Sequence, residues 1–273
     1  MPLVKSFWKN LNFSNYEQPK IHCPTCKKGF INPIKDSVKF KETAETVALK
    51  KSDGPWSEMD LDFKFSCLLK CDNNNCGEVV SCAGTGFFDQ DDPTFDEETG
   101  QYWASYFKYF KPEYFSKPIH IIELKDLYPS AITKKLEDSF KIFFCDSESC
   151  ANKIRIVVEV LMDALKVKKT VITTGNKRKN LTLHARILNY GSKNKELSDL
   201  LLAIKWIGNS GSHNSKVTKD DTLDAYRILE YVLDKLYDKN ATHLMKMAKI
   251  INKKRIPLSQ IELSKKKKRR LLE

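Results

Sequence analysis

Four of the eight cysteines form two short pairs whose spacing is typical of metal ligands. The first pair is Cys23-Pro-Thr-Cys26, a CxxC turn that points backbone N–H groups at the sulfurs. The second pair is Cys71 and Cys76, which are separated by four residues and followed by glycine. Zn²⁺ closes tetrahedrally on four ligands and binds thiolates well. The sequence therefore predicts one structural zinc ion bound by Cys23, Cys26, Cys71 and Cys76.

The other four cysteines are less regular in their spacing. Cys67 lies inside an alternating apolar stretch and is predicted to face a core, although Cys67 and Cys82 remain alternative ligands. Cys145 and Cys150 have no further Cys or His close by in sequence, so burial as free thiols is the favoured interpretation.

The N-terminal segment lacks the apolar centre of a signal peptide, and no apolar run reaches the roughly 18 residues of a membrane span. We therefore expect a cytoplasmic protein, without a membrane partner, whose cysteines are metal ligands or buried thiols rather than disulfides.

The cysteine pairs must be positioned by residues 1–127, which are predicted to be β-rich. Residues 61–67 alternate between apolar and polar side chains, as a half-buried strand does, and residues 79–86 are predicted to form a second strand. The 44 residues between the two pairs exceed what a minimal zinc ribbon needs. An inserted hairpin containing residues 52–56 is predicted to account for them.

After Pro129 the apolar period changes from two to about 3.6, which indicates helices. Five apolar stripes predict five amphipathic helices, and Asp220 and Asp221 favour the start of the last one. The stripes are Ile132/Leu136/Phe140/Phe143, Ile154/Val157/Val158/Leu161/Leu165, Leu181/Ala185/Leu188, Leu197/Leu200/Leu201/Ile204 and Leu223/Tyr226/Leu229/Val232/Leu233/Leu236.

We therefore predict an α+β protein with a zinc-ribbon-like β domain over residues 1–127. A helical bundle follows over 128–240, and a basic C-terminal arm over 241–273. The arm is expected to begin as a short helix, with Leu244, Met247 and Ile251 spaced for docking, before Pro257 ends it.

The segment from Lys205 to His213, Lys-Trp-Ile-Gly-Asn-x3-His, lies between the fourth and fifth predicted helices. Together with Arg155-x3-Glu159 and Leu181-x4-Arg186-Ile187, it resembles the bacterial domain-of-unknown-function family four-one-four-five. That family is grouped with the HEPN bundles. The two cysteine pairs resemble its N-terminal zinc ribbon, and residues 221–237 resemble its closing helix.

This resemblance implies a HEPN-like bundle in a restriction-associated or anti-phage protein, from a family whose members are often dimeric. Some HEPN relatives are metal-independent ribonucleases with an Arg-x4–6-His pattern. Here the positions that should offer Arg are Trp206, Ile207 and Gly208, and the nearest cation, Lys205, stands eight residues before His213. A helix-capping role for Asn209 and His213 is therefore favoured over catalysis, and Arg155 with Glu159 is interpreted as a structural i,i+4 pair.

The positive charge is concentrated in the arm. The net charge is +12, and residues 239–273 hold twelve Lys or Arg against two Glu, a net +10. Such an arm suits phosphate backbones without sequence preference. Its densest run is Lys265, Lys266, Lys267, Lys268, Arg269 and Arg270.

We therefore expect a zinc-containing, nucleic-acid-associated binding or regulatory component of a prokaryotic anti-phage defence or restriction system, acting on RNA or DNA with other defence proteins. The alternatives are a ribonuclease using His213 with Asn209 and Lys205, and a protein–protein adaptor.

Overall fold

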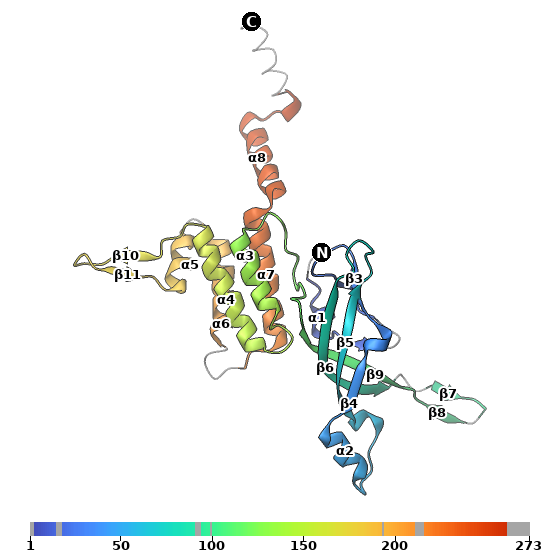
Figure 1. Ribbon diagram of the computed structural model, residues 1–273. Helices are drawn as coiled ribbons and strands as arrows, with labels where there is room; N and C mark the ends of the chain where they lie inside the picture. The colour runs from blue at the N-terminus through green and yellow to red at the C-terminus, as the bar shows by residue number, and fades with distance from the viewer. Residues whose placement is uncertain are drawn as a thin grey trace.

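The structure is a computed structural model of the 273-residue chain. It describes residues 3–14, 18–90, 94–98, 100–192, 194–210 and 216–260. Figure 1 shows a mixed α+β protein in which a curled N-terminal sheet is followed by a helical C-terminal region. The predicted order of a β-rich part and then a helical part is confirmed.

One antiparallel sheet dominates the N-terminal half. Its order is β1-β9-β6-β5-β3-β2, and β4 also pairs with β5. The strands are β1 (Phe13–Ser14), β2 (Ile21–His22), β3 (Phe30–Pro33), β4 (Lys39–Glu42), β5 (Asp62–Cys71), β6 (Val79–Gln90) and β9 (Tyr106–Phe115). Side chains along β5 alternate strictly between exposed and buried, so the strand predicted at 61–67 is confirmed and extends to Cys71. The strands β7 (Thr94–Asp96) and β8 (Gln101–Trp103) form a separate hairpin.

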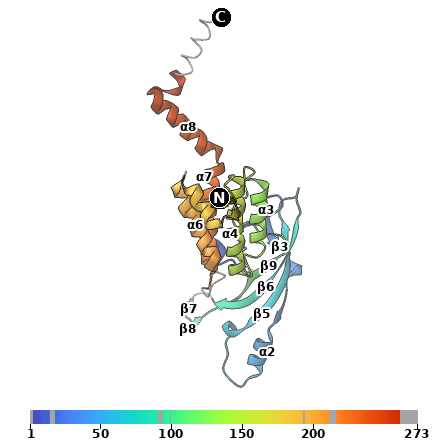
Figure 2. The ribbon, with the colours of Figure 1, turned by 90° about the vertical axis from the view of Figure 1, so that its left-hand side faces the viewer.

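The sheet is curled, as Figure 2 shows, and two glycines allow the curl. A Cβ at Gly86 would lie 1.8 Å from the ring of Phe63, and one at Gly84 would lie 2.1 Å from the carbonyl oxygen of Lys111. The register between β6 and β9 also shifts at Ala83/Gly84. The ring of Phe63 can therefore lie directly on β6, and the strands bend around it.

The predicted hairpin between the cysteine pairs is present as the antiparallel strands β4 and β5, but a helix lies in the connection between them. The segment contains η1 (Lys35–Ser37), β4, the helix α2 (Ala44–Lys51) and η2 (Glu58–Asp60). The hydroxyl of Thr43 accepts a hydrogen bond from the backbone N–H of Thr46 and caps α2. Residues 52–56 follow that helix, so the Gly-Pro segment belongs to a long helical connection between β4 and β5 and not to a tight turn.

The helical region contains the five predicted helices and a sixth, which belongs to the arm. The helices are α3 (Ser130–Phe140), α4 (Ser147–Ala164), α5 (Leu183–Gly191), α6 (Lys195–Ser210), α7 (Lys219–Tyr237) and α8 (Lys239–Lys254). A small hairpin, β10 (Thr170–Ile172) and β11 (Arg178–Asn180), joins α4 to α5. Asp221 completes a capping box with Thr218 at the start of α7, as the sequence favoured.

The face predicted for α5 is wrong. Leu188 is 51% exposed, and the buried residues are Leu183, Arg186 and Ile187. Arg186 forms an ion pair of 2.6 Å with Asp163 and also donates to the carbonyl of Val167. Because a charged residue lies on the buried face, the apolar residues of this helix do not follow a regular helical period.

The sheet and the helices share one core. The short helix α1 (Lys5–Lys9) is joined to α7 by ion pairs of Lys5 with Asp224 (2.8 Å) and of Lys9 with Asp220 (2.6 Å). Trp8 packs edge-on against Phe143 and Phe144, and Phe115 of β9 also contacts Phe144. The two halves therefore bury apolar surface against each other.

The helix α8 projects away from this core (Figure 1). Leu244 is 62% exposed and Ile251 is 36% exposed, so the docking predicted for these side chains is not present. Among the described residues, no helix combines the length and the apolar character needed to cross a bilayer.

Candidate metal centre

Strand pairing brings the two cysteine pairs together. The first pair lies in the turn between β2 and β3. The second pair begins at Cys71, the last residue of β5, and ends at Cys76 in the turn before β6. Because β3 pairs with β5 in a register that sets Ile31 opposite Cys71, the two turns lie side by side at one end of the sheet.

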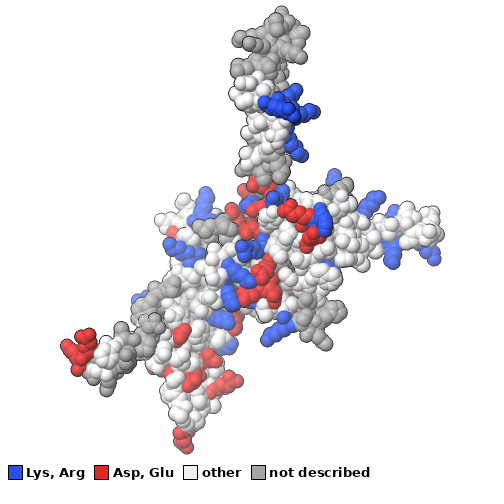
Figure 3. Space-filling view, turned by 180° about the vertical axis from the view of Figure 1, so that it is seen from behind, with Lys and Arg blue, Asp and Glu red and all other residues white. Residues whose placement is uncertain are grey.

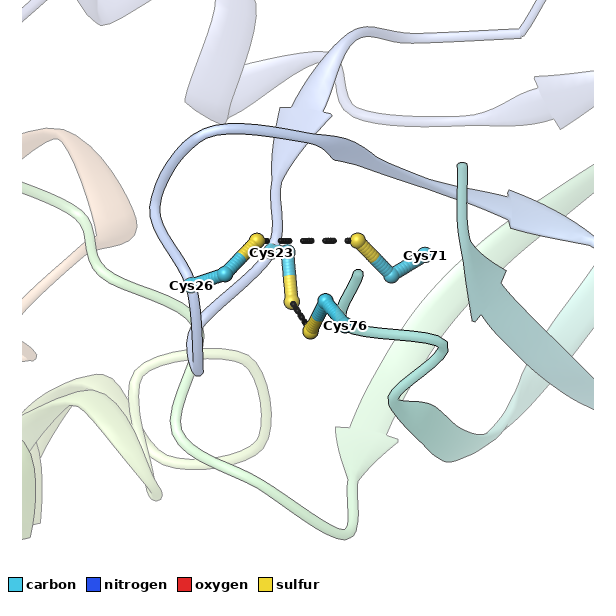
Figure 4. Close-up of side chains that lie close together, drawn as sticks. All are labelled: Cys23, Cys26, Cys71 and Cys76. Carbon is cyan, nitrogen blue, oxygen red and sulfur yellow. Dashed lines mark hydrogen bonds between the residues drawn. The ribbon is translucent and has the colours of Figure 1, made fainter. Parts of the chain in front are cut away.

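The four sulfurs form a compact group, shown in Figure 4. All lie within 4.8 Å of one another, with Cys23 Sγ 3.8 Å from Cys76 Sγ and Cys26 Sγ 3.7 Å from Cys71 Sγ. A tetrahedral ion with metal–sulfur bonds of about 2.3 Å would set its ligands about 3.8 Å apart. A disulfide would need about 2.05 Å, and all four thiols are free. The spacing fits a shared ion.

The first turn is shaped to aim N–H groups at sulfur. Lys27 has a φ of 58°, and its N–H donates to the carbonyl of Cys23. The N–H of Gly29 then points at Cys26 Sγ at 3.5 Å. A Cβ at Gly29 would lie 2.8 Å from Cys71 Sγ and 2.6 Å from Asp72 Oδ1, so glycine is required where the turns meet.

The second turn is pinned to the first by its own polar groups. Asp72 Oδ1 accepts a hydrogen bond of 2.7 Å from the N–H of Phe30. Asn73 Nδ2 lies 3.7 Å from Cys26 Sγ, and the carbonyl of Asn73 accepts from the N–H groups of Cys76 and Gly77. Gly77 has a φ of 60°, a conformation that costs glycine little.

Burial and hydrogen bonding shift the pKa values of the thiols in opposite directions. Cys23 and Cys71 are buried, at 0% and 4% exposed, whereas Cys26 and Cys76 are half-buried. Hydrogen bonds from the N–H groups of Gly29 and Lys28 lower the pKa of Cys26 to about 6. Burial raises the pKa of Cys71 to about 12. Four thiolates this close need a cation to neutralise them.

Hydrogen bonds and an ion pair around the four cysteines hold the two turns in place. Glu78 accepts from Thr25 of the first turn at 2.7 Å and from Lys117, just after β9, at 2.5 Å. The hydrogen bond and charge of Lys117 hold the pKa of Glu78 below its usual value. Lys27 also donates to the carbonyl of Leu124 in the segment that leads to α3. The centre therefore links the sheet to the start of the helical region.

The chemistry available to this group is metal binding. Four protein sulfurs fill all the positions of a tetrahedral ion, which is the arrangement of a structural centre, whereas catalytic ions keep one position open. The candidate ligands predicted from the sequence are thus brought together as a set.

The remaining cysteines lie apart from this group. Cys67 and Cys82 oppose each other on β5 and β6 and are buried, so the core position predicted for Cys67 is confirmed. Cys150 is buried at 3.3 Å from the hydroxyl of Tyr226, as predicted, whereas Cys145 is exposed, so the burial predicted for it is wrong. Among the described residues, none of these four cysteines joins a cluster of three or more metal-ligating side chains.

Of the other predicted site residues, those that the structure describes do not come together as a cluster. Lys205 and Asn209 lie on α6, and Lys205 Nζ is 3.3 Å from the centroid of the Trp206 ring. His213 lies outside the described residues, as do Lys265 to Arg270. Arg155 Nη1 is 2.7 Å from Glu159 Oε1, so the predicted structural pair is confirmed.

The structure adds a half-buried cation that the sequence did not single out. Lys219, at the start of α7, lies 5.2 and 5.3 Å from the ring centroids of Phe143 and Phe144. Burial lowers its pKa to about 8, and the charge of Lys111 contributes. No local pattern marks this lysine, since the sheet and the α3–α4 turn that cover it are remote in sequence.

Two family models match the chain. Residues 137–269 match a domain of unknown function (DUF4145). Residues 11–115 match a different domain of unknown function (DUF8608), and this match contains both cysteine pairs. The resemblance found in the sequence is thus confirmed for the helical region, while the cysteine pairs fall in a second model. No curated protein and no solved structure matches the chain.

Proposed function

We propose that this chain is a zinc-containing protein that binds nucleic acid through its basic C-terminal arm. In this proposal the N-terminal sheet carries a zinc-ribbon-like structural centre and the helical region is HEPN-like. The zinc assignment is supported by four cysteine sulfurs at tetrahedral spacing, since a set of thiolates favours zinc over the hard cations Mg²⁺ and Ca²⁺.

The observation that carries the nucleic-acid proposal is the charge on α8. Lys246, Lys249 and Lys253 are exposed and lie three and four residues apart, so they share one face of the helix. Among the described residues, no carboxylate forms an ion pair with them. Figure 3 shows blue side chains along one side of the projecting helix, whereas red and blue are mixed over the body.

Residues 239–273 extend this charge, with a net +10 in the sequence. A projecting helix with cations on one face can lie along a phosphate backbone and release its counterions. A purely solvated arm would not need its cations gathered on one face. The match of residues 137–269 to the DUF4145 model and the family resemblance extend the proposal to a component of a prokaryotic anti-phage defence or restriction system.

The test is a binding titration of the full chain with labelled RNA and DNA at several salt concentrations. The proposal expects binding that weakens steeply with salt and a shallower salt dependence once Lys265 to Arg270 are removed. If the salt dependence of binding is the same for the two proteins, Lys265 to Arg270 do not contact nucleic acid and face solvent or a protein partner. No detectable binding to either nucleic acid would favour the adaptor.

A further inference from the structure

A cavity of about 580 Å³ opens on the buried face of the curled sheet. Its wall is aromatic: Phe13 of β1, Phe65 of β5 and Phe110 of β9 line it, and each is less than 10% exposed. Phe13 and Phe110 are paired in register, while β5 lies two strands away from β9. Strands that are not neighbours therefore line one cavity because the sheet is curled, and its volume is that of a small-molecule site.

The rim of the cavity is polar and carries a cation. Lys35 and Gln18 line it and are exposed, and Gln18 also donates to the carbonyl of Ser14. None of the described lining residues is acidic. The amide of Gln18 offers both donors and an acceptor to a polar ligand edge.

A further cation lies beside the aromatic wall. Lys108 Nζ lies 4.3 Å from the centroid of Phe40, whose ring is 6.3 Å from that of Phe110. Lys39 and Lys41, the neighbours of Phe40 on β4, alternate with it and lie on the opposite, exposed face of the sheet. Phe40 itself is 45% exposed, so an aromatic ring faces solvent beside Lys108.

We propose that this cavity binds one unpaired nucleobase of a single strand, with the adjoining phosphates at Lys35 and Lys108. Aromatic walls stack on bases, lysines neutralise phosphates, and unpaired bases can be turned out into a pocket. An apolar ligand would fit the wall but would make no use of Lys35 and Lys108. The site rests on the proposed nucleic-acid function and gives it a preference for single strands that the arm alone does not supply.

The first test fills the cavity in the full-length protein. Val38 lines it and is half-buried, so Val38→Trp places a large ring in the space of the base. Val47→Trp is the matched control, because Val47 is 38% exposed on α2 and does not line the cavity. Fluorescence anisotropy is measured with a labelled ten-nucleotide RNA and with an RNA duplex of the same length.

We expect Val38→Trp to weaken single-strand binding at least about five-fold, the lower end of what one stacked base contributes, with duplex binding unchanged. The control should leave both affinities unchanged. Equal single-strand affinity in the folded Val38→Trp protein would overturn the cavity while leaving the proposed function in place. Absence of binding by the unsubstituted protein would overturn both.

A second measurement keeps the proposal testable if Val38→Trp fails to fold. Cys67 lines the cavity, and the exposed Cys145 lies elsewhere. Alkylation of the unsubstituted protein by iodoacetamide is followed at each cysteine by mass spectrometry, with and without saturating single strand. The base should slow alkylation of Cys67 and leave Cys145 unchanged. An unchanged Cys67 rate with the strand bound would overturn the site.

Discussion

Replacing Lys246, Lys249 and Lys253 with glutamine should flatten the salt dependence of nucleic-acid binding. These side chains span seven residues of α8, or roughly 10 Å along the helix axis at 1.5 Å per residue. One strand of duplex DNA presents a phosphate about every 3.4 Å, so about three phosphates lie within reach. Each contact contributes about 0.9 to the slope of log K against log salt on duplex, which predicts a slope smaller by about 3.

The assay is anisotropy with one labelled duplex at four or more salt concentrations. The control replaces Lys51, Lys134 and Lys153, three exposed lysines on other helices, so that the net charge changes equally. We expect the control slope to match that of the unsubstituted protein. An unchanged slope in the α8 variant would refute the contact, and an equal drop in the control would show that only net charge matters.

Three further outcomes are expected. The protein should not cleave RNA in the absence of added metal, because no Arg stands at the spacing that HEPN ribonucleases use. His213→Ala and Lys205→Ala should therefore leave the cleavage assay unchanged. Cleavage by the unsubstituted protein that both substitutions abolish would contradict this. In the unsubstituted protein the free energy of unfolding should rise between about pH 8 and pH 10.5, because Lys219 keeps its proton over that range in the unfolded chain and loses it in the folded one. Lys219→Met should remove this rise. Urea unfolding at several pH values measures it. Gly208→Ala should lower the melting temperature, because its Cβ would lie 2.6 Å from Cβ of Arg155; an unchanged melt would show that α4 and α6 can separate freely.

The sequence predicted those features that depend on local chemistry. Turn-type spacing identified Cys23, Cys26, Cys71 and Cys76, because the residues of a metal knuckle are neighbours in the chain. The strand at β5 and the stripe of α7 were predicted because one face of each is apolar at a regular period.

The remainder depended on contacts between remote segments. Arg186 on the buried face of α5 can be understood only with Asp163 of α4 beside it. The cavity depends on Gly84 and Gly86, which allow the curl that brings β1, β5 and β9 around one space. The helix α2 was missed because the Gly-Pro turn after it resembles that of a hairpin.

Metal content of the purified chain tests the zinc centre most directly. Elemental analysis should find one zinc per chain in the unsubstituted protein and none in Cys23→Ser/Cys71→Ser, while Cys145→Ser, an exposed thiol outside the cluster, should keep its zinc. Structural zinc contributes roughly 10–16 kcal/mol of apparent binding free energy in small domains, which rivals the whole stability of a protein. The double variant should therefore lose the folded sheet, as near-ultraviolet circular dichroism would show. Zinc-free protein that is folded and insensitive to both substitutions would contradict the account.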